Sequence, residues 1–157
     1  QFAAEPLAIS ANGFRAVVDL NLQGTWQVTR AWAERRIAAG EGGNIVNIVL
    51  STQHGAPMMM HSAAARDGVE NMTLAFAWGP NGITVNAIAP GTIDTEALDN
   101  YGRDEMVAWG GRLPVPRLGS PDEIGWAVAY LVSPAGAYVT GTTIIVDGGQ
   151  HLMGADR

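Results

Sequence analysis

The 157-residue chain contains no cysteine. This absence excludes disulfide bridges, a cysteine nucleophile and any metal site that is built from thiolate ligands. The three histidines, His54, His61 and His151, do not have the spacing of zinc ligands. We therefore predict a protein without a metal site.

Basic residues are also scarce: 9 basic side chains stand against 15 aspartates and glutamates, and the net charge is −6. The sequence has no basic stripe that could bind a phosphate backbone, which excludes a nucleic-acid partner. No apolar run reaches the ~18 residues of a membrane-spanning helix. The first ten residues do not combine a basic stretch with an apolar block, so they do not form a signal peptide. We predict a cytoplasmic protein with no membrane partner.

Hydrophobic periodicity predicts alternating helices and strands. Apolar residues at helical spacing predict a helix over residues 12–38. Two runs of mainly β-branched residues predict buried strands over residues 44–50 and Ile83–Pro90, with a small-residue helix over residues 61–78 between them. A third strand is expected within "TTIIVDGG". This alternation predicts parallel strands joined by right-handed crossovers.

A long connection, residues 91–120, precedes the last predicted helix and is expected to contain short irregular helices. The helix itself begins in "SPDEIGWAVAYLV". Ser120 is expected as its N-cap and Pro121 as its first residue, with acidic residues in the first turn.

The sequence also lacks a G-x-G-x-x-G motif, whose backbone amides bind the pyrophosphate of a dinucleotide. Three parallel strands that are buried on both faces leave open edges and apolar faces when they stand alone. The predicted fold class is therefore α/β: the second half of a Rossmann-like, doubly wound parallel sheet. We expect residues 1–157 to be the C-terminal part of one domain, whose nucleotide-binding half would precede residue 1.

Five segments carry a resemblance to a known family. In chain order they are "DLNLQGTWQVTRA", "GGNIVNIV", "HSAAARDGV", "GITVNAIAPGTIDT" and "YVTGTTIIVDGG". Together they resemble the second half of a short-chain dehydrogenase/reductase over almost the whole chain. The resemblance implies a Rossmann-type oxidoreductase with NADPH (or NADH) as its cofactor.

The catalytic helix departs from the Tyr-x-x-x-Lys pattern of that family. Ser62 stands in the place of the tyrosine and Arg66 in the place of the lysine, while Val49 and Leu50 replace the strand-end serine. The "HSAAAR" pattern, with "NYG" after the Pro-Gly loop, is similar to peroxisomal-type trans-2-enoyl-CoA reductases and to 2,4-dienoyl-CoA reductases.

This replacement favours alkene reduction over carbonyl reduction. Carbonyl reduction needs a proton donor of suitable acidity at the reacting oxygen, and a serine hydroxyl is far less acidic than a phenol. When a C=C bond conjugated to a thioester is reduced, charge develops on the thioester oxygen, which needs hydrogen-bond donors rather than a strong acid. We therefore expect an acyl-CoA thioester, a trans-2-enoyl-CoA, as the substrate.

The resemblance also implies roles for individual residues. The cation of the catalytic helix binds the nicotinamide ribose, and backbone groups after the Pro-Gly pair hold the nicotinamide carboxamide. The implied catalytic residues are Asn21, Ser62 and Arg66; the cofactor-binding residues are Arg66, Pro90, Gly91, Ile93 and Thr95; and the substrate-binding residues are Ser51 and Tyr101.

Several of these residues have a structural explanation as well. Arg66 also fits an exposed cation whose stem lies along a helix, and Ser62 also fits an ordinary helix start. Asn21 has poor helix propensity, and a capping or bulge-filling role would explain it too. Tyr101 fits a displaced proton donor or, as we prefer, a residue that lines the acyl pocket.

Two other functions remain open. One is an alcohol or carbonyl dehydrogenase of the same family. The other is a catalytically silent assembly subunit, for which the lost serine and tyrosine argue. The resemblance implies a homodimer or homotetramer, and the apolar residues of "NMTLAFAW" and "WAVAYLV" are consistent with such an assembly.

Overall fold

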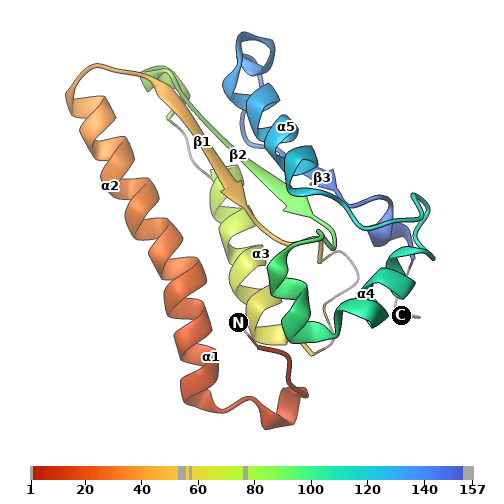
Figure 1. Cartoon of the computed structure of the whole chain (residues 1–157). Helices are drawn as coiled ribbons and strands as arrows, with labels where there is room; N and C mark the ends of the chain where they lie inside the picture. Colours follow the sequence, from red (N-terminus) through yellow and green to blue (C-terminus); the bar gives the residue numbers. More distant parts are fainter. Residues whose placement is uncertain (1, 53–55, 57, 76–77, 154–157) are drawn as a thin grey trace.

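The computed structural model describes residues 2–52, 56, 58–75 and 78–153. At its centre lies a parallel sheet of three strands in the order β1-β2-β3 (Figure 1). The strands are β1 (Gly43–Ile48), β2 (Ile83–Pro90) and β3 (Thr143–Val146). The predicted α/β class with parallel strands is confirmed, and β2 has the predicted bounds.

The helix predicted over residues 12–38 is one long rod of three segments, seen at the left of Figure 1. It consists of α1 (Ala11–Val18), a π-helical segment η2 (Asp19–Gln23) and α2 (Gly24–Ala38). The side chain of Ser10 caps its start by accepting a hydrogen bond from the amide of Gly13 at 3.0 Å. Hydrophobic periodicity does not show the π segment, because one widened turn leaves the apolar pattern on either side nearly unchanged.

The catalytic helix of the resemblance is α3 (Met60–Ala75). It begins close to its predicted start, whereas Trp78 lies outside the helix and residues 76–77 lie outside the described residues. β1 ends at Ile48, but its backbone pairing continues: the amide of Val49 donates to the carbonyl of Ile88 at 2.8 Å. The prediction of a strand over residues 44–50 is therefore close to the observed pairing.

The core is organised around β2, whose side chains point alternately to the two faces of the sheet. On one face, Val85 packs with Ala33 of α2, and Ala87 packs with Val69 of α3. On the other face Ile88 is 0% exposed, and α5 (Pro121–Val132) packs against the sheet there. Burying one such aliphatic side chain contributes roughly 1.5–3 kcal/mol to stability. The unbroken apolar run of β2 is thus explained by cover on both faces.

The connection from β2 to α5 contains the expected short helices. They are η4 (Glu96–Tyr101) and α4 (Arg103–Gly110). The other short helical segments are η1 (Pro6–Ala8), η3 (Gly79–Asn81), η5 (Pro134–Gly136) and η6 (Gln150–Leu152).

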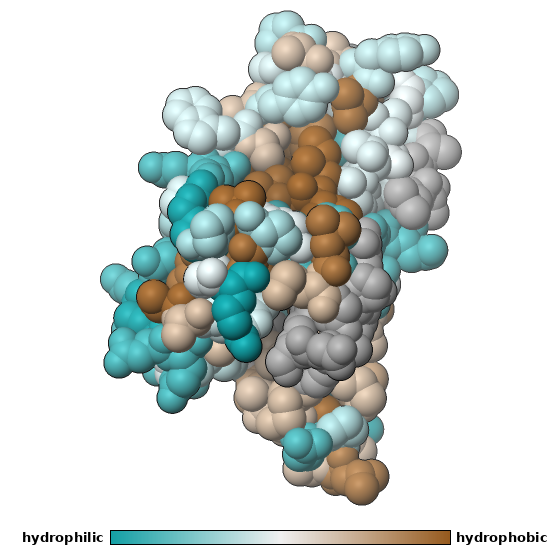
Figure 2. Space-filling model, turned by 90° about the vertical axis from the view of Figure 1, so that its right-hand side faces the viewer, coloured by the Kyte–Doolittle hydropathy of each residue, from teal (hydrophilic) through white to brown (hydrophobic). Residues whose placement is uncertain are grey.

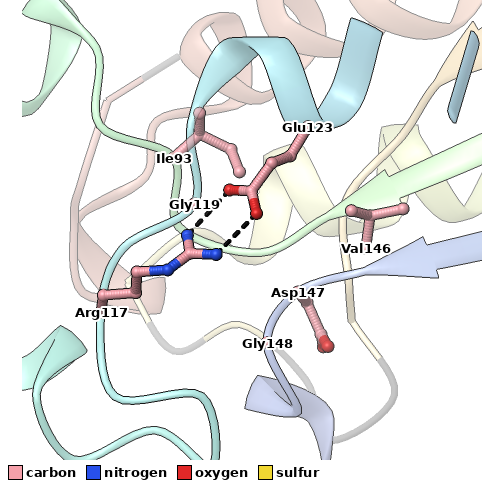
Figure 3. Close-up of a pocket in the computed structure, with 7 residues that line it drawn as sticks. All are labelled: Ile93, Arg117, Gly119, Glu123, Val146, Asp147 and Gly148. Atoms are coloured by element: carbon pink, nitrogen blue, oxygen red, sulfur yellow. Dashed lines mark hydrogen bonds and ion pairs between the residues drawn. The ribbon is translucent and has the colours of Figure 1, made fainter. Parts of the chain in front are cut away.

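The start of α5 is held by a capping box, which confirms Ser120 as the N-cap. The amide of Ser120 donates to the carboxylate of Glu123 at 2.8 Å, and the amide of Glu123 donates to the Ser120 hydroxyl oxygen at 3.4 Å. Arg117 adds a two-pronged ion pair with the same carboxylate, at 2.6 and 2.8 Å (Figure 3). Glu123 therefore joins the helix start to the preceding loop.

Apolar surface is open at both edges of the sheet. No strand among the described residues pairs with the outer edge of β1 or β3. An open groove of about 590 Å³ separates β1 from α2, and Leu20 and Val28 on its wall are each 72% exposed. Figure 2 looks at the side that carries α5 and β3 and shows an apolar strip, brown, on the surface. This is the surface that we expect of one part of a larger sheet.

The described helices are all too short or too polar to cross a lipid bilayer.

Glu123 provides a test of the helix start. Arg117, and after it the Ser120 amide, lower the pKa of the Glu123 carboxyl from 4.5 to about 2. A lowered folded-state pKa stabilises the fold above the unfolded pKa, and this stabilisation is lost as pH falls through the folded pKa. We expect Glu123→Gln to lower the melting temperature near neutral pH, and the difference from the wild type to shrink between about pH 4.5 and pH 2.

The matched control is Glu96→Gln, because Glu96 forms no ion pair in the described part of the chain. This change should leave the melting temperature nearly unaltered. A difference between Glu123→Gln and the wild type that is the same at neutral and acidic pH would contradict the assignment.

Candidate active site

The candidate site lies at the carboxyl ends of β1 and β2, where α3 begins and the loop after β2 leaves the sheet. Arg66 reaches from α3 to the end of β1, where its Nη1 donates to the carbonyl of Ile48 at 2.6 Å. Burial lowers the pKa of the Arg66 guanidinium, but arginine starts so high that it stays charged near neutral pH. A guanidinium carries five N–H donors, and in the described part of the chain one hydrogen bond engages it. Arg66 can therefore bind a further oxygen ligand.

Ser62 lies one turn before Arg66 on α3, so both side chains lie on one side of the helix. Ser62 is 0% exposed, as is its neighbour His61. The His61 ring packs against Phe2, with ring centroids 4.4 Å apart. Both residues therefore belong to the interior of the site region, and neither is a surface group at a helix start.

Asn21 lies in the π segment η2. The side-chain Nδ2 of Asn21 donates to the backbone carbonyl of Val17 at 2.9 Å. The backbone carbonyl of Asn21 accepts from the Thr25 hydroxyl at 2.7 Å. The segment packs closely on α3, because a Cβ added at Gly68 would lie 3.0 Å from Leu22. π segments often occur at functional sites, where they change the direction of a side chain or carbonyl group. The structure thus packs the segment that carries Asn21 against α3, and the hydrogen bonds of Asn21 also fit the bulge-filling explanation.

In the loop after β2, the backbone amide of Ile93 has no hydrogen-bond partner among the described residues. A parallel bridge joins Ile93 to Gly119: the Gly119 amide donates to Thr92 at 3.1 Å, and the Asp94 amide donates to Gly119 at 2.8 Å. The bridge uses the groups before and after Ile93, so the N–H and C=O of Ile93 itself point away from Gly119. No hydrogen bond among the described residues uses them. Ile93 and Gly119 line a small cavity beside the Arg117 side chain (Figure 3).

The loop also approaches β3 closely. The amide of Gly91, the residue after β2, donates to the carbonyl of Val146 at 3.0 Å. A Cβ added at Gly91 would lie 2.7 Å from the Cβ of Asp147, so glycine is the residue that this contact admits. Pro90 ends β2, and Thr95 lies at the other end of the loop, where its carbonyl accepts from Arg103 at 2.8 Å.

A buried polar network stands behind the site, centred on Asp147 at the end of β3. Its Oδ2 accepts from the Ser51 hydroxyl at 3.0 Å and from the His151 amide at 2.8 Å, and its Oδ1 accepts from the Gly149 amide at 2.9 Å. The His151 ring also lies within hydrogen-bond distance, with its Nδ1 2.9 Å from Oδ2. Burial by itself would raise the pKa of Asp147, but the hydrogen bonds from the His151 amide and ring, the Gly149 amide and the Ser51 hydroxyl outweigh it and lower the pKa below its ordinary value. The Ser51 hydroxyl hydrogen points to Asp147, so as a substrate contact Ser51 would offer its oxygen.

The Asp147 network was not predicted from the sequence. The sequence signal that could have indicated it was a carboxylate at the end of an apolar strand, since a buried charge needs partners.

Tyr101, the last residue of η4, is half-buried. Its segment is held by Arg103, whose Nε donates to Asp99 at 2.6 Å. His54, the remaining histidine, lies outside the described residues.

A family model described as Enoyl-(Acyl carrier protein) reductase matches residues 2–151. The chain belongs to the short-chain dehydrogenase/reductase family. This confirms the family that the five segments indicated, together with its Rossmann-like fold.

The short-chain dehydrogenase/reductase relatives include the peroxisomal 2,4-dienoyl-CoA reductase of Rattus norvegicus, 40% identical over 96% of this chain and 53% of that protein. A solved short chain dehydrogenase from Bacillus anthracis has 38% identity and a TM-score of 0.84, over 96% of this chain and 60% of that one. A 4-hydroxyisoleucine dehydrogenase mutant complexed with NADH and succinate has 27% identity and a TM-score of 0.91, over 98% and 65%. The chain spans about half the length of the curated relatives it matches.

Gly91 provides a test of the loop geometry. We expect Gly91→Ala to lower the free energy of unfolding by about 1–3 kcal/mol, because its methyl group would overlap Asp147. The matched control is Gly125→Ala in α5, where an added Cβ meets no described heavy atom within 4 Å. This control should raise stability by about 0.4–1 kcal/mol. Denaturant unfolding of the two variants measures both changes, and equal stabilities would contradict the close contact at Gly91.

Proposed function

We propose that this chain is the catalytic half of an NAD(P)H-dependent oxidoreductase that reduces the C=C bond of a trans-2-enoyl-CoA thioester. The observation that carries the proposal is the pair on α3: Ser62 and Arg66 replace a tyrosine and a lysine. Arg66 keeps the cation next to the end of β1, through its hydrogen bond to Ile48. The site then has hydrogen-bond donors without a phenol, which suits an enolate oxygen better than a new hydroxyl group.

The residues present fit a nicotinamide cofactor. The free amide of Ile93 and its carbonyl provide one donor and one acceptor, which is what a carboxamide requires. The guanidinium of Arg66 has donors left for ribose hydroxyls. Gly91 lets the loop lie close to β3, because a Cβ at this position would lie 2.7 Å from the Cβ of Asp147. A bound reduced nicotinamide supplies a hydride to the substrate.

The chain's own residues act on the thioester oxygen. Once the hydride has added to the β carbon, the electrons of the C=C bond move to the thioester oxygen as an enolate. Donors on Ser62 and Arg66 stabilise this charge, which is greater in the transition state than in the substrate. A proton from water then adds to the α carbon, which leaves hydroxide in the solvent, and the product is the saturated thioester. Tyr101 and Ser51 line the acyl side of this site in the proposal.

The remaining part of the site belongs to the other half of the domain. The groove between α2 and β1 is apolar, and β1 has an open edge, so a further parallel strand can pair there. We propose that this strand belongs to the nucleotide-binding half, which binds the pyrophosphate. The whole protein, rather than residues 1–157 alone, is therefore the active species, as a homodimer or homotetramer.

The name of the rat relative, a peroxisomal 2,4-dienoyl-CoA reductase, supports a CoA thioester substrate. A specific observation also favours the second candidate, an alcohol or carbonyl dehydrogenase: the fold matches a 4-hydroxyisoleucine dehydrogenase closely.

The cytoplasmic location stays a prediction, whereas the name of the rat relative gives a peroxisomal location for that protein. The silent assembly subunit is the third candidate.

The substrate class can be tested with the whole protein. We expect oxidation of NADPH or NADH with short- and medium-chain trans-2-enoyl-CoA thioesters, and much slower oxidation with ketones or aldehydes of equal length. Absorbance of the reduced nicotinamide measures both rates. Equal or faster turnover of the carbonyl compounds would favour the dehydrogenase, and dinucleotide binding without any turnover would favour the silent subunit.

Arg66 can be tested in the same assay. We expect Arg66→Met to lower kcat/KM for the enoyl thioester by about 10²–10³, because it removes a charged donor at the developing charge. Arg66→Lys should stay within about tenfold of the wild type, because lysine keeps the cation. Wild-type activity in Arg66→Met would show that Arg66 lies outside the reaction.

A further inference from the structure

We propose that Gln150 is a positioning residue for the nicotinamide end of the cofactor. This inference rests on the proposed function, and it concerns the loop that would hold the carboxamide. Gln150 lies on η6, after β3, and is 58 residues away from Thr92 in the sequence. The geometry connects it directly to the residue that precedes Ile93.

The side-chain carbonyl of Gln150 accepts two hydrogen bonds from Thr92. One comes from the Thr92 amide at 2.9 Å, and the other comes from the Thr92 hydroxyl at 3.2 Å. The backbone carbonyl of Thr92 is engaged as well, by the Gly119 amide at 3.1 Å. Each of the two peptide groups that flank Thr92 is thus held by a hydrogen bond, and Ile93 follows directly.

Gln150 is itself held firmly. The backbone amide of Gln150 donates to the backbone carbonyl of Asp147 at 3.0 Å. The Asp147 carboxylate accepts from the backbone amides of Gly149 and His151, at 2.9 and 2.8 Å. Its Oε1 would lie 2.8 Å from a Cβ at Gly91, so it fills the space beside that glycine. The backbone of Gln150 is thus bonded to the end of β3 and its Oε1 to the loop after β2, so the position of β3 constrains the position of that loop.

Loss of the Oε1 acceptor would leave the Thr92 amide without a partner among the described residues. An unsatisfied amide near the interior costs free energy, and the loop lowers this cost by moving to water. Such a movement displaces Ile93, whose free N–H and C=O are the groups proposed to bind the carboxamide. The adenosine end of the cofactor does not depend on this loop, since the pyrophosphate site is proposed to lie on the other half.

The test compares two ligands on the whole protein. NADPH (or NADH, whichever the wild type binds) carries the nicotinamide, while the corresponding ADP-ribose lacks it. Gln150→Met removes the acceptor at similar length, and Gln150→Glu keeps an oxygen at the same place. The control is Gln27→Met, an exposed glutamine on α2. Calorimetric titration gives the Kd values, and a thermal melt confirms that each variant is folded.

We expect Gln150→Met to weaken dinucleotide binding about tenfold, the effect of one hydrogen bond of ~1.4 kcal/mol. Its affinity for the ADP-ribose should stay within about twofold of the wild type. Gln150→Glu and Gln27→Met should bind the dinucleotide within about threefold of the wild type.

Two results would overturn the inference while the proposed function stands. One is unchanged dinucleotide binding by Gln150→Met, and the other is an equal loss of both ligands, which indicates a structural role. A wild-type protein that binds neither ligand would overturn the proposed function, and the inference with it.

Discussion

The pairing of β2 with both of its neighbours is the constraint on which the rest of the structure depends. β2 is covered on both faces, so its amides and carbonyls have no access to water and must pair with β1 and β3. This pairing brings the carboxyl ends of three strands, which are far apart in the sequence, to one edge. Ligand sites of open parallel sheets form at that edge, because there the chain leaves the sheet as loops. The candidate active site follows from this arrangement.

At this edge, buried and half-buried hydrogen bonds connect the loops. Asp147 connects the end of β3 to Ser51 beyond β1, and Gln150 connects the next turn to Thr92 beyond β2. Each of these side chains joins segments that belong to different strands. A fully satisfied polar network makes one arrangement of the loops much more stable than its alternatives. The amide of Ile93, which has no partner in the described part of the chain, is then held at a defined place, although Ile93 lies outside the regular helices and strands.

The chemistry expected of the site follows from the charged and polar groups that α3 carries. The chain contains no lysine, and the cation on α3 is Arg66. A guanidinium does not lose its proton near neutral pH, so it stabilises charge but is a poor relay for protons. Together with a serine in the place of a tyrosine, this is the basis for our proposal that the site binds negative charge on oxygen. Enolate formation requires such binding, whereas carbonyl reduction also requires a proton at that oxygen.

The sequence by itself determined the order and type of the helices and strands, the N-cap at Ser120 and the family. It also determined that β2 is buried on both faces. These depend on local periodicity, on short-range capping and on motifs within one segment, which are all written in neighbouring residues. Only the tertiary structure decided the π segment around Asn21, the hydrogen-bond partner of Ser51 and that of Gln150. A π turn leaves the apolar pattern almost unchanged, and the partners Asp147 and Thr92 meet these side chains only after the strands have paired. Hydrogen bonds between residues 58 or 96 positions apart have no signature in local sequence.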